Sequence, residues 1–256
     1  MKFDSTLDQL SVHVIAVNKQ PRNTNLINCL RSTLVSSSIF VESAVTPNVV
    51  DATLIQDDIT RAQILLGRDV TALEICVAQS HQICYSHAVE HGTKFALIFE
   101  DDVALVDKHL FAESLKKIYE TSDPTIWTLY SPNWSIWKIS NGVMKSVFPP
   151  PCAACYVINE SAMKIALSGR PIGVADWPMW ANRVNFEMIT NTGICLTKED
   201  SYIEIHRKDA KLNKHQLRSL FSPLKLLEVP ISARFRSIIL YPLIWKLSEK
   251  FSSTIG

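Results

Sequence analysis

The segment Phe95 to Val103, FALIFEDDV, most constrains the fold, because an apolar run leads directly into three consecutive carboxylates. A short apolar run bounded by polar segments predicts a buried strand of a parallel sheet with both faces covered. Glu100, Asp101 and Asp102 then lie at the carboxyl end of that strand. Ligands of open α/β sheets bind at this edge, where the loops that leave the strands form a crevice. We therefore expect a ligand site at the triplet.

The three carboxylates need either a compensating cation or free access to water. Two carboxylates about 4 Å apart repel each other by roughly 4 kcal/mol at an effective dielectric constant of about 20. Mg²⁺ or Mn²⁺ binds carboxylate oxygens and commonly shares its other positions with substrate phosphates. The triplet alone is equally compatible with a solvated acidic turn, so both interpretations remain at this point.

The composition is typical of a soluble globular protein of one large or two small domains, with 256 residues, 47% hydrophobic and 20% charged. The first residues lack the pattern of a secretory signal, and no apolar run approaches the roughly 18 residues of a membrane span. These features predict a cytoplasmic protein. The six cysteines lie in apolar contexts, which favours core residues over disulfides, and the Cys152–Cys155 pair has no second pair at zinc spacing.

Charge is unevenly distributed along the chain. Residues 211–256 contain eight Lys or Arg and two Glu, a net charge of +6, whereas the whole chain has a net charge of only +1. An acidic body argues against a nucleic-acid interface. The tail joins basic residues to the apolar run Ile238 to Trp245, which suits a helical segment at an anionic membrane surface. A C-terminal helix packed on the domain explains the same pattern.

A long helix is predicted directly before the FALIF strand. Thr71 and Glu74 have the spacing of a capping box, apolar residues recur at helical spacing, and Gly92 indicates the end, so the helix is expected over residues 72–91. Ser80 and His81 lie near its apolar stripe. They are either packed, hydrogen-bonded residues or groups close to a bound nucleotide.

Strands and helices alternate along most of the chain, which predicts an α/β fold. Residues 47–58 are expected to be irregular, and Asp176 precedes Trp177 and Pro178 at an expected helix N-terminus, where it is either a cap or a base facing a substrate. Strands are predicted over residues 11–17, 39–45, 95–99, 125–130, 153–158 and 201–208, and further helices over 26–36, 110–121 and 160–168.

Three segments together resemble one family. They are GRDVTALEICVAQSHQICYSHAVEHGTKFALIFEDDV, PPPCAACYVINESAMKIAL and GVADWPM, and in this order and at these separations they are similar to the family 25 glycosyltransferases of bacterial lipooligosaccharide synthesis. The resemblance covers roughly residues 12–205 and leaves the tail outside.

The resemblance implies a GT-A-type fold, in which a Rossmann-like mixed sheet is flanked by helices. It implies a catalytic domain over residues 1–210, with a nucleotide-sugar half at about 11–105 and an acceptor half at about 106–210, followed by a basic helical tail at 211–256. The acidic triplet corresponds to the family's D-x-D-type motif for Mn²⁺ or Mg²⁺. Asp101 and Asp102 are then metal ligands, with Glu100 closer to the ribose.

Other roles also follow from the resemblance. Asp176 corresponds to the base that takes the proton from the attacking hydroxyl, and His206 to a C-terminal histidine that completes the metal site. The loop containing Asn18 and Arg22 is expected beside the nucleotide, although its sequence departs from the I-N-L pattern usual in the family.

The acidic triplet and the resemblance together imply a metal-dependent, inverting glycosyltransferase that moves a sugar, galactose from UDP-galactose in most of the family, to a lipooligosaccharide, lipopolysaccharide or capsule glycan. Its expected partners are a nucleotide-sugar, a glycan or lipid-linked glycan and an anionic membrane surface, without nucleic acid. Its expected location is peripheral, at the cytosolic face of the inner membrane. The alternatives are a nucleotidyltransferase or phosphoesterase, which the lack of a Gly-rich phosphate loop disfavours, and a non-catalytic glycan-binding relative.

Overall fold

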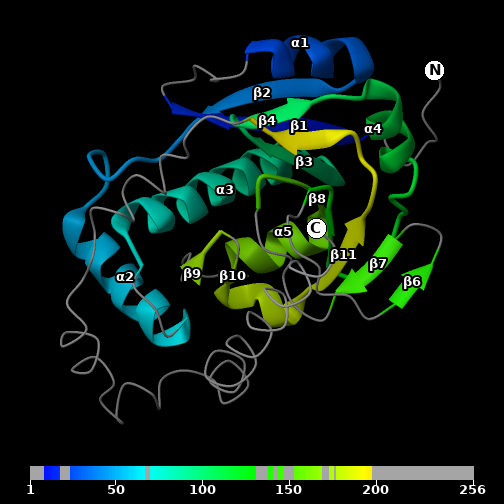
Figure 1. Cartoon of the computed structure of the whole chain (residues 1–256). Helices are drawn as coiled ribbons and strands as arrows, with labels where there is room; N and C mark the ends of the chain where they lie inside the picture. The colour runs from blue at the N-terminus through cyan, green and yellow to red at the C-terminus, as the bar shows by residue number, and fades with distance from the viewer. Residues whose placement is uncertain are drawn as a thin grey trace, which may run out of the picture.

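An eight-stranded mixed sheet forms the centre of the molecule (Figure 1). The computed structural model describes residues 9–17, 24–66, 70–130, 138–140, 143–146, 153–168, 173–175 and 177–197. In spatial order the strands are β2 (Ser38–Ser43), β1 (Leu10–Ala16), β3 (Phe95–Glu100), β8 (Cys155–Asn159), β5 (Thr125–Thr128), β11 (Asn185–Ile189), β7 (Val143–Ser146) and β6 (Lys138–Ser140).

The first three strands of the sheet are parallel, and an antiparallel strand joins them to the rest. β1 pairs in parallel with both β2 and β3, whereas β8 runs antiparallel to β3 on one side and to β5 on the other. The nucleotide-sugar half expected at 11–105 and the acceptor half expected at 106–210 therefore contribute neighbouring strands to one sheet. The expected α/β class, with a mixed and helix-flanked sheet, is confirmed.

Helices cover both faces of the sheet (Figure 1). α1 (Thr24–Thr33) and α4 (Lys108–Leu115) pack on one face, where Leu30, Phe99 and Phe111 share a core with the fully buried Trp127. α3 (Ala72–Glu90) and α5 (Glu160–Leu167) pack on the other face around Ile98. Alternate residues of β3 thus enter different cores, which confirms a strand with two covered faces. Its predicted parallel pairing is correct only toward β1, because an apolar run carries no information on the direction of β8.

The predicted helix before β3 is confirmed with its cap. Thr71 Oγ1 accepts a hydrogen bond from Glu74 N at 3.3 Å, and Glu74 Oε2 accepts one from Thr71 N at 2.9 Å. α4 begins two residues before its predicted start because Asp107 caps it, accepting hydrogen bonds from the His109 and Leu110 amides. It ends at Leu115, six residues before the predicted end. The irregular segment predicted at 47–58 is wrong in its second half. α2 (Ala52–Leu66) begins there, where the Asp51 carboxylate accepts a hydrogen bond from Thr53 N at 2.8 Å.

Short elements complete the described part of the chain. β4 (Val103–Leu105) pairs with β12 (Ile194–Leu196), β9 (Gly173–Val174) pairs with β10 (Trp177–Pro178), and a 3₁₀ helix, η3, follows at Met179–Arg183. Asp176 was expected directly before a helix, but β10 comes between it and η3. Among the described cysteines, Cys29, Cys76, Cys84 and Cys195 are free thiols. The strand predicted at 201–208 and the tail at 211–256 lie outside the described residues.

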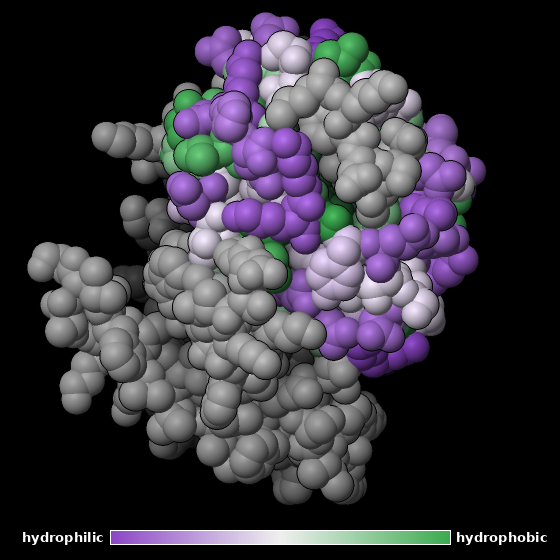
Figure 2. Space-filling model, turned by 90° about the vertical axis from the view of Figure 1, so that its right-hand side faces the viewer, coloured by the Kyte–Doolittle hydropathy of each residue, from purple (hydrophilic) through white to green (hydrophobic). Residues whose placement is uncertain are grey.

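The described surface visible in Figure 2 is mainly hydrophilic, with hydrophobic residues in small separate groups. Among the described residues, no helix has both the length and the apolarity needed to cross a bilayer.

Candidate functional site

The acidic triplet lies where the parallel strands end. Glu100 is the last residue of β3 and pairs in register with Ile15 of β1, and Asp101 and Asp102 form the turn into β4. The backbone is held on both sides, since Glu100 N donates to Ala154 O at 2.8 Å and Thr197 N donates to Asp102 O at 2.7 Å. Asp101 and Asp102 are only 7% and 9% exposed. The turn is therefore a fixed structure rather than a loose surface loop.

A buried row of polar side chains reaches Glu100 from α3. His81 Nε2 lies 3.4 Å from Glu100 Oε1, and His81 Nδ1 lies 2.6 Å from the Tyr156 hydroxyl. The Tyr156 hydroxyl also bonds to that of Tyr85. If His81 carries its proton on Nε2, every member is satisfied: Tyr85 donates to Tyr156, Tyr156 to His81, and His81 to the carboxylate. The row orients Glu100 from the protein interior.

The two tyrosines retain their protons across the ordinary pH range. Burial raises the pKa of Tyr156 well above its usual value, and the neighbouring Tyr85 and Glu100 add to the effect. Burial likewise raises the pKa of Tyr85. Both phenols therefore remain available as hydrogen-bond donors.

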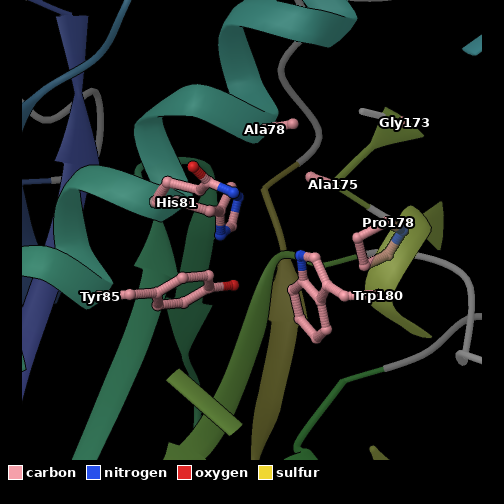
Figure 3. Close-up of a pocket in the computed structure, with 8 residues that line it drawn as sticks. Ala78, His81, Tyr85, Gly173, Ala175, Pro178 and Trp180 are labelled. Atoms are coloured by element: carbon pink, nitrogen blue, oxygen red, sulfur yellow. The ribbon is translucent and has the colours of Figure 1, made fainter. Parts of the chain in front are cut away.

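A small hollow adjoins this row (Figure 3). Its free volume of about 20 Å³ corresponds to about one water molecule. His81 and Tyr85 of α3 line one side, and Pro178 and Trp180 the other, with the Tyr85 and Trp180 rings edge to face at 6.3 Å. Ala175 also lines the hollow. Asp176, the next residue in the chain, lies outside the described residues.

Ser80 holds α3 against the segment after β2. Its hydroxyl donates to Cys76 O at 2.9 Å and accepts a hydrogen bond from Val45 N at 2.8 Å. The side chain is thus buried with two protein partners, and any contact with a nucleotide stays a prediction.

Five of the predicted site residues fall within the described part: Ser80, His81, Glu100, Asp101 and Asp102. The structure brings His81 and Glu100 into contact and places both aspartates directly after Glu100. The others, Asn18, Arg22, Asp176 and His206, lie outside it. The sequence analysis missed Tyr85 and Tyr156. The only available signal for Tyr85 was its position four residues after His81, on the same helix face.

The side chains of the acidic turn are of the chemical type that a hard divalent ion prefers. Glu100, Asp101 and Asp102 offer carboxylate oxygens, which suit Mg²⁺ or Mn²⁺ better than ions that prefer nitrogen or sulfur. The roles of Asp101 and Asp102 as ligands of such an ion stay predictions.

Comparison with known proteins adds a family to this geometry. The chain matches the family model of glycosyltransferase family 25 (LPS biosynthesis protein) over residues 9–149. The search of curated proteins gave no match.

Among solved structures, similarity is distant. A glycosyltransferase involved in glycosylation of the major capsid of PBCV-1 is 12% identical with a TM-score of 0.32, and the match covers 61% of this chain and 63% of that one. A putative nucleotide-diphospho-sugar transferase from Desulfovibrio desulfuricans is 9% identical with a TM-score of 0.34, covering 87% and 99%. A mannose-1-phosphate geranyltransferase from Thermus thermophilus is 10% identical with a TM-score of 0.32, covering 71% and 73%.

The family match spans more than half of the chain and includes α3, β3 and the acidic turn. The chain therefore belongs to glycosyltransferase family 25 and is a transferase.

Proposed function

We propose that this family 25 member is a metal-dependent, inverting galactosyltransferase that uses UDP-galactose and a bacterial lipooligosaccharide, lipopolysaccharide or capsule glycan. The observation that supports the proposal most strongly is the rigid acidic turn at the carboxyl end of β3, whose Glu100 is oriented by His81. Family membership supplies the reaction class and the link to LPS biosynthesis.

Asp101 and Asp102 would hold Mn²⁺ or Mg²⁺, with His206 as a further ligand. When bound, such an ion stabilises the negative charge of the departing nucleoside diphosphate. Glu100 would face the ribose, and its fixed orientation through His81 and Tyr156 would reduce the entropy lost on donor binding. Asn18, Arg22 and Ser80 would line the rest of the nucleotide site.

Asp176 would act as the general base. In an inverting transfer the acceptor oxygen bonds to the anomeric carbon as the bond from that carbon to the diphosphate breaks, and the hydroxyl proton passes to the base. Ala175, which precedes Asp176, lines the hollow beside His81 and Trp180.

A donor screen tests the proposal. The full chain is incubated with Mn²⁺, a set of nucleotide-sugars and lipooligosaccharide acceptors, and the products are read by mass. We expect galactose transfer from UDP-galactose, and a rate about 10²- to 10⁴-fold lower for Asp176→Asn with UDP binding retained. Near-normal turnover in this variant would remove Asp176 from its role. Pyrophosphate exchange or donor hydrolysis without any sugar transfer would instead support a nucleotidyltransferase or phosphoesterase.

We also propose that the basic tail places the enzyme at the cytosolic face of the inner membrane. A Lys or Arg near an anionic surface contributes about 1 kcal/mol, so Arg234, Arg236, Lys246 and Lys250 together support reversible binding. The full chain should co-sediment with phosphatidylglycerol vesicles and be released by high salt. Replacing these four residues by Gln should abolish co-sedimentation, and unchanged binding would show that the tail is not the anchor.

A further inference from the structure

A second cluster of potential ligands lies under the C-terminal half of α3. His13 of β1, Glu42 of β2 and His87 of α3 each offer one ligand atom, and these atoms all lie within 4.8 Å of one another. His13 Nδ1 is 3.0 Å and His87 Nδ1 is 2.6 Å from Glu42 Oε1. Three elements that are far apart in the sequence thus supply two imidazoles and one carboxylate to one place.

This cluster is separate from the acidic turn. His87 follows His81 by six residues, which corresponds to about 9 Å along the helix axis. On β1, the residue in register with Glu100 is Ile15, and His13 lies two positions before it on the same face of the sheet. None of the three residues takes part in the row from Tyr85 to Glu100.

His13 is held in the orientation that a metal-binding histidine requires. Its Nε2 lies 2.9 Å from Ser11 Oγ, and that hydroxyl lies 3.1 Å from Thr93 Oγ1 and 3.5 Å from Phe95 O. If Nε2 carries the proton and donates to Ser11, the Nδ1 lone pair faces Glu42. Metal-binding histidines commonly donate their other ring N–H in this way, which fixes both the tautomer and the ring plane.

The exposure of the three side chains increases from His13 to Glu42 to His87. The side chain of His13 is fully buried, that of Glu42 is 11% exposed and that of His87 is 31% exposed. Phe40 forms a wall beside both imidazoles, stacked on His13 at 5.1 Å and tilted against His87 at 4.7 Å. The cluster is therefore closed on the sheet side and partly exposed to solvent on the His87 side.

The ligand types indicate a different metal from the acidic turn. Imidazole suits Zn²⁺, Cu²⁺, Ni²⁺ and Fe²⁺, whereas Mg²⁺ and Mn²⁺ suit sites made mainly of carboxylate, carbonyl and water oxygens. Some zinc sites consist of two histidines and one carboxylate, with water or substrate as the fourth ligand. We propose that His13, Glu42 and His87 bind a zinc-type ion that fastens α3 to β1 and β2, independently of the sugar-transfer site.

The observed distances require only a small adjustment. Tetrahedral zinc with bonds near 2.0–2.1 Å separates its ligand atoms by about 3.3 Å. The nitrogen-to-oxygen distances of 3.0 Å from His13 and 2.6 Å from His87 must therefore widen by about 0.3 Å and about 0.7 Å. His87, as the partly exposed member on a helix surface, is the side chain with freedom to move.

Metal titration of the full chain tests the proposal. Tag-free protein is treated with a chelator, dialysed into buffer with excess Mg²⁺ to fill oxygen sites, and titrated with Zn²⁺ or Co²⁺. We expect one equivalent to bind, visible cobalt absorption bands typical of low coordination, and a rise in Tm of about 5 °C or more at saturating Zn²⁺. His87→Gln keeps a hydrogen-bond donor for Glu42 and should lower the Zn²⁺ affinity by more than about tenfold. Ser11→Ala should lower it by about 10- to 100-fold.

Two histidines provide matched controls. His109→Gln changes an exposed residue of α4 and should leave Zn²⁺ binding unchanged. His91 is an exposed neighbour of His87, and its Nδ1 lies 2.8 Å from His87 O. His91→Gln should also retain Zn²⁺ binding.

Glu42→Gln distinguishes Zn²⁺ binding at the proposed cluster from binding at the exposed His87–His91 pair. Loss of binding in this variant supports the proposal. If Glu42→Gln binds Zn²⁺ as the natural chain does while His91→Gln does not, the ion binds the exposed His87–His91 pair, and the proposal is wrong. If the folded natural chain binds no Zn²⁺ above the level of His87→Gln, the cluster is only a hydrogen-bonded His–Glu–His group.

Discussion

The hydroxyl group of Tyr156 joins two other buried polar side chains, those of His81 and Tyr85. Tyr156→Phe would leave His81 Nδ1 and the Tyr85 hydroxyl without their bonds to Tyr156. An unsatisfied buried polar group costs about 1–3 kcal/mol, and we expect a loss of that size in the free energy of unfolding, measured by urea denaturation. Without its bond to Tyr156, His81 no longer holds Glu100 in one orientation, so UDP affinity should fall as well.

Tyr85→Phe is the matched control. It removes only the terminal hydroxyl of the row and leaves the bond from Tyr156 to His81, so its effect on stability and UDP affinity should be smaller. Equal effects of the two substitutions would contradict the proposed order of donors.

At the residue scale, the sequence could indicate Glu100, Asp101, Asp102 and His81 but not Tyr156. Charged residues after an apolar strand are unusual enough to be noticed. A tyrosine in an apolar strand resembles any core aromatic, and its partner His81 is 75 residues away in the sequence. Such a contact depends on the pairing of β3 with β8, which no local pattern encodes.

The pairing of β4 with β12 holds the element that follows the acidic turn, and Gly193 makes this pairing possible. Gly193 has φ of +68°, and its carbonyl accepts hydrogen bonds from Val106 N at 2.9 Å and Asp107 N at 3.1 Å. A Cβ at this position would clash with Asp107 O and lie 2.9 Å from Asp107 Cβ. Gly193→Ala should therefore lower the free energy of unfolding by more than about 3 kcal/mol, since backbone strain of about 1–3 kcal/mol adds to the clash.

Gly92→Ala is the control that measures backbone strain without a steric clash. It has φ of +66°, and a Cβ added there would meet no atom within 4 Å, so Gly92→Ala should cost only about 1–2 kcal/mol in the same urea titration. A Gly193→Ala variant as stable as Gly92→Ala would show that β4 and β12 can separate without cost.

At the element scale, helices and strands with strong local sequence signals were predicted correctly, and those with weak signals were missed. α3 has a capping box, a helical apolar pattern and Gly92 at its end, and its predicted bounds agree with the structure to one residue. α2 has only the Asp51 cap, close to Pro47, and no helix was predicted there. β11 is a central strand of five residues with polar positions, and its role became evident only from its pairing with β5 and β7.

The stability of the whole molecule should fall in alkaline solution. Burial raises the pKa of the Cys76 thiol from 9.0 to about 11 and raises the pKa of Tyr85 above its usual value near 10. Above pH 9 the unfolded chain therefore binds fewer protons than the folded chain, so the free energy of unfolding decreases as pH rises. We expect a decrease between pH 9 and about pH 11, measured by urea denaturation with a reductant present.

Tyr85→Phe identifies the contribution of one phenol. Above pH 10 the Tyr85 phenol ionises in the unfolded natural chain, which lowers the free energy of unfolding, and Tyr85→Phe lacks this group. The difference in free energy of unfolding between the natural chain and the variant should therefore narrow as pH rises. A difference that stays constant from pH 8 to pH 11 would contradict a raised pKa of Tyr85.

At the scale of the whole molecule, the sequence predicted the α/β class and the helices on both faces but not the order of the strands. β8 lies between β3 and β5 although it follows both in the chain. Its position therefore depends on long-range pairing. The same strand brings Tyr156 next to His81, so the place of Tyr156 in the site and the strand order were missed for one physical reason.

Binding of UDP to the full chain, measured by calorimetry with and without Mn²⁺, tests the central claim that the acidic turn is a metal-dependent donor site. We predict binding with Mn²⁺ that a chelator abolishes and an affinity at least about tenfold lower for Asp102→Asn, a change of about 1.4 kcal/mol. Asp57→Asn, on the exposed surface of α2, should bind as the natural chain does. Equal UDP binding with and without Mn²⁺, or unchanged binding by Asp102→Asn, would contradict the account.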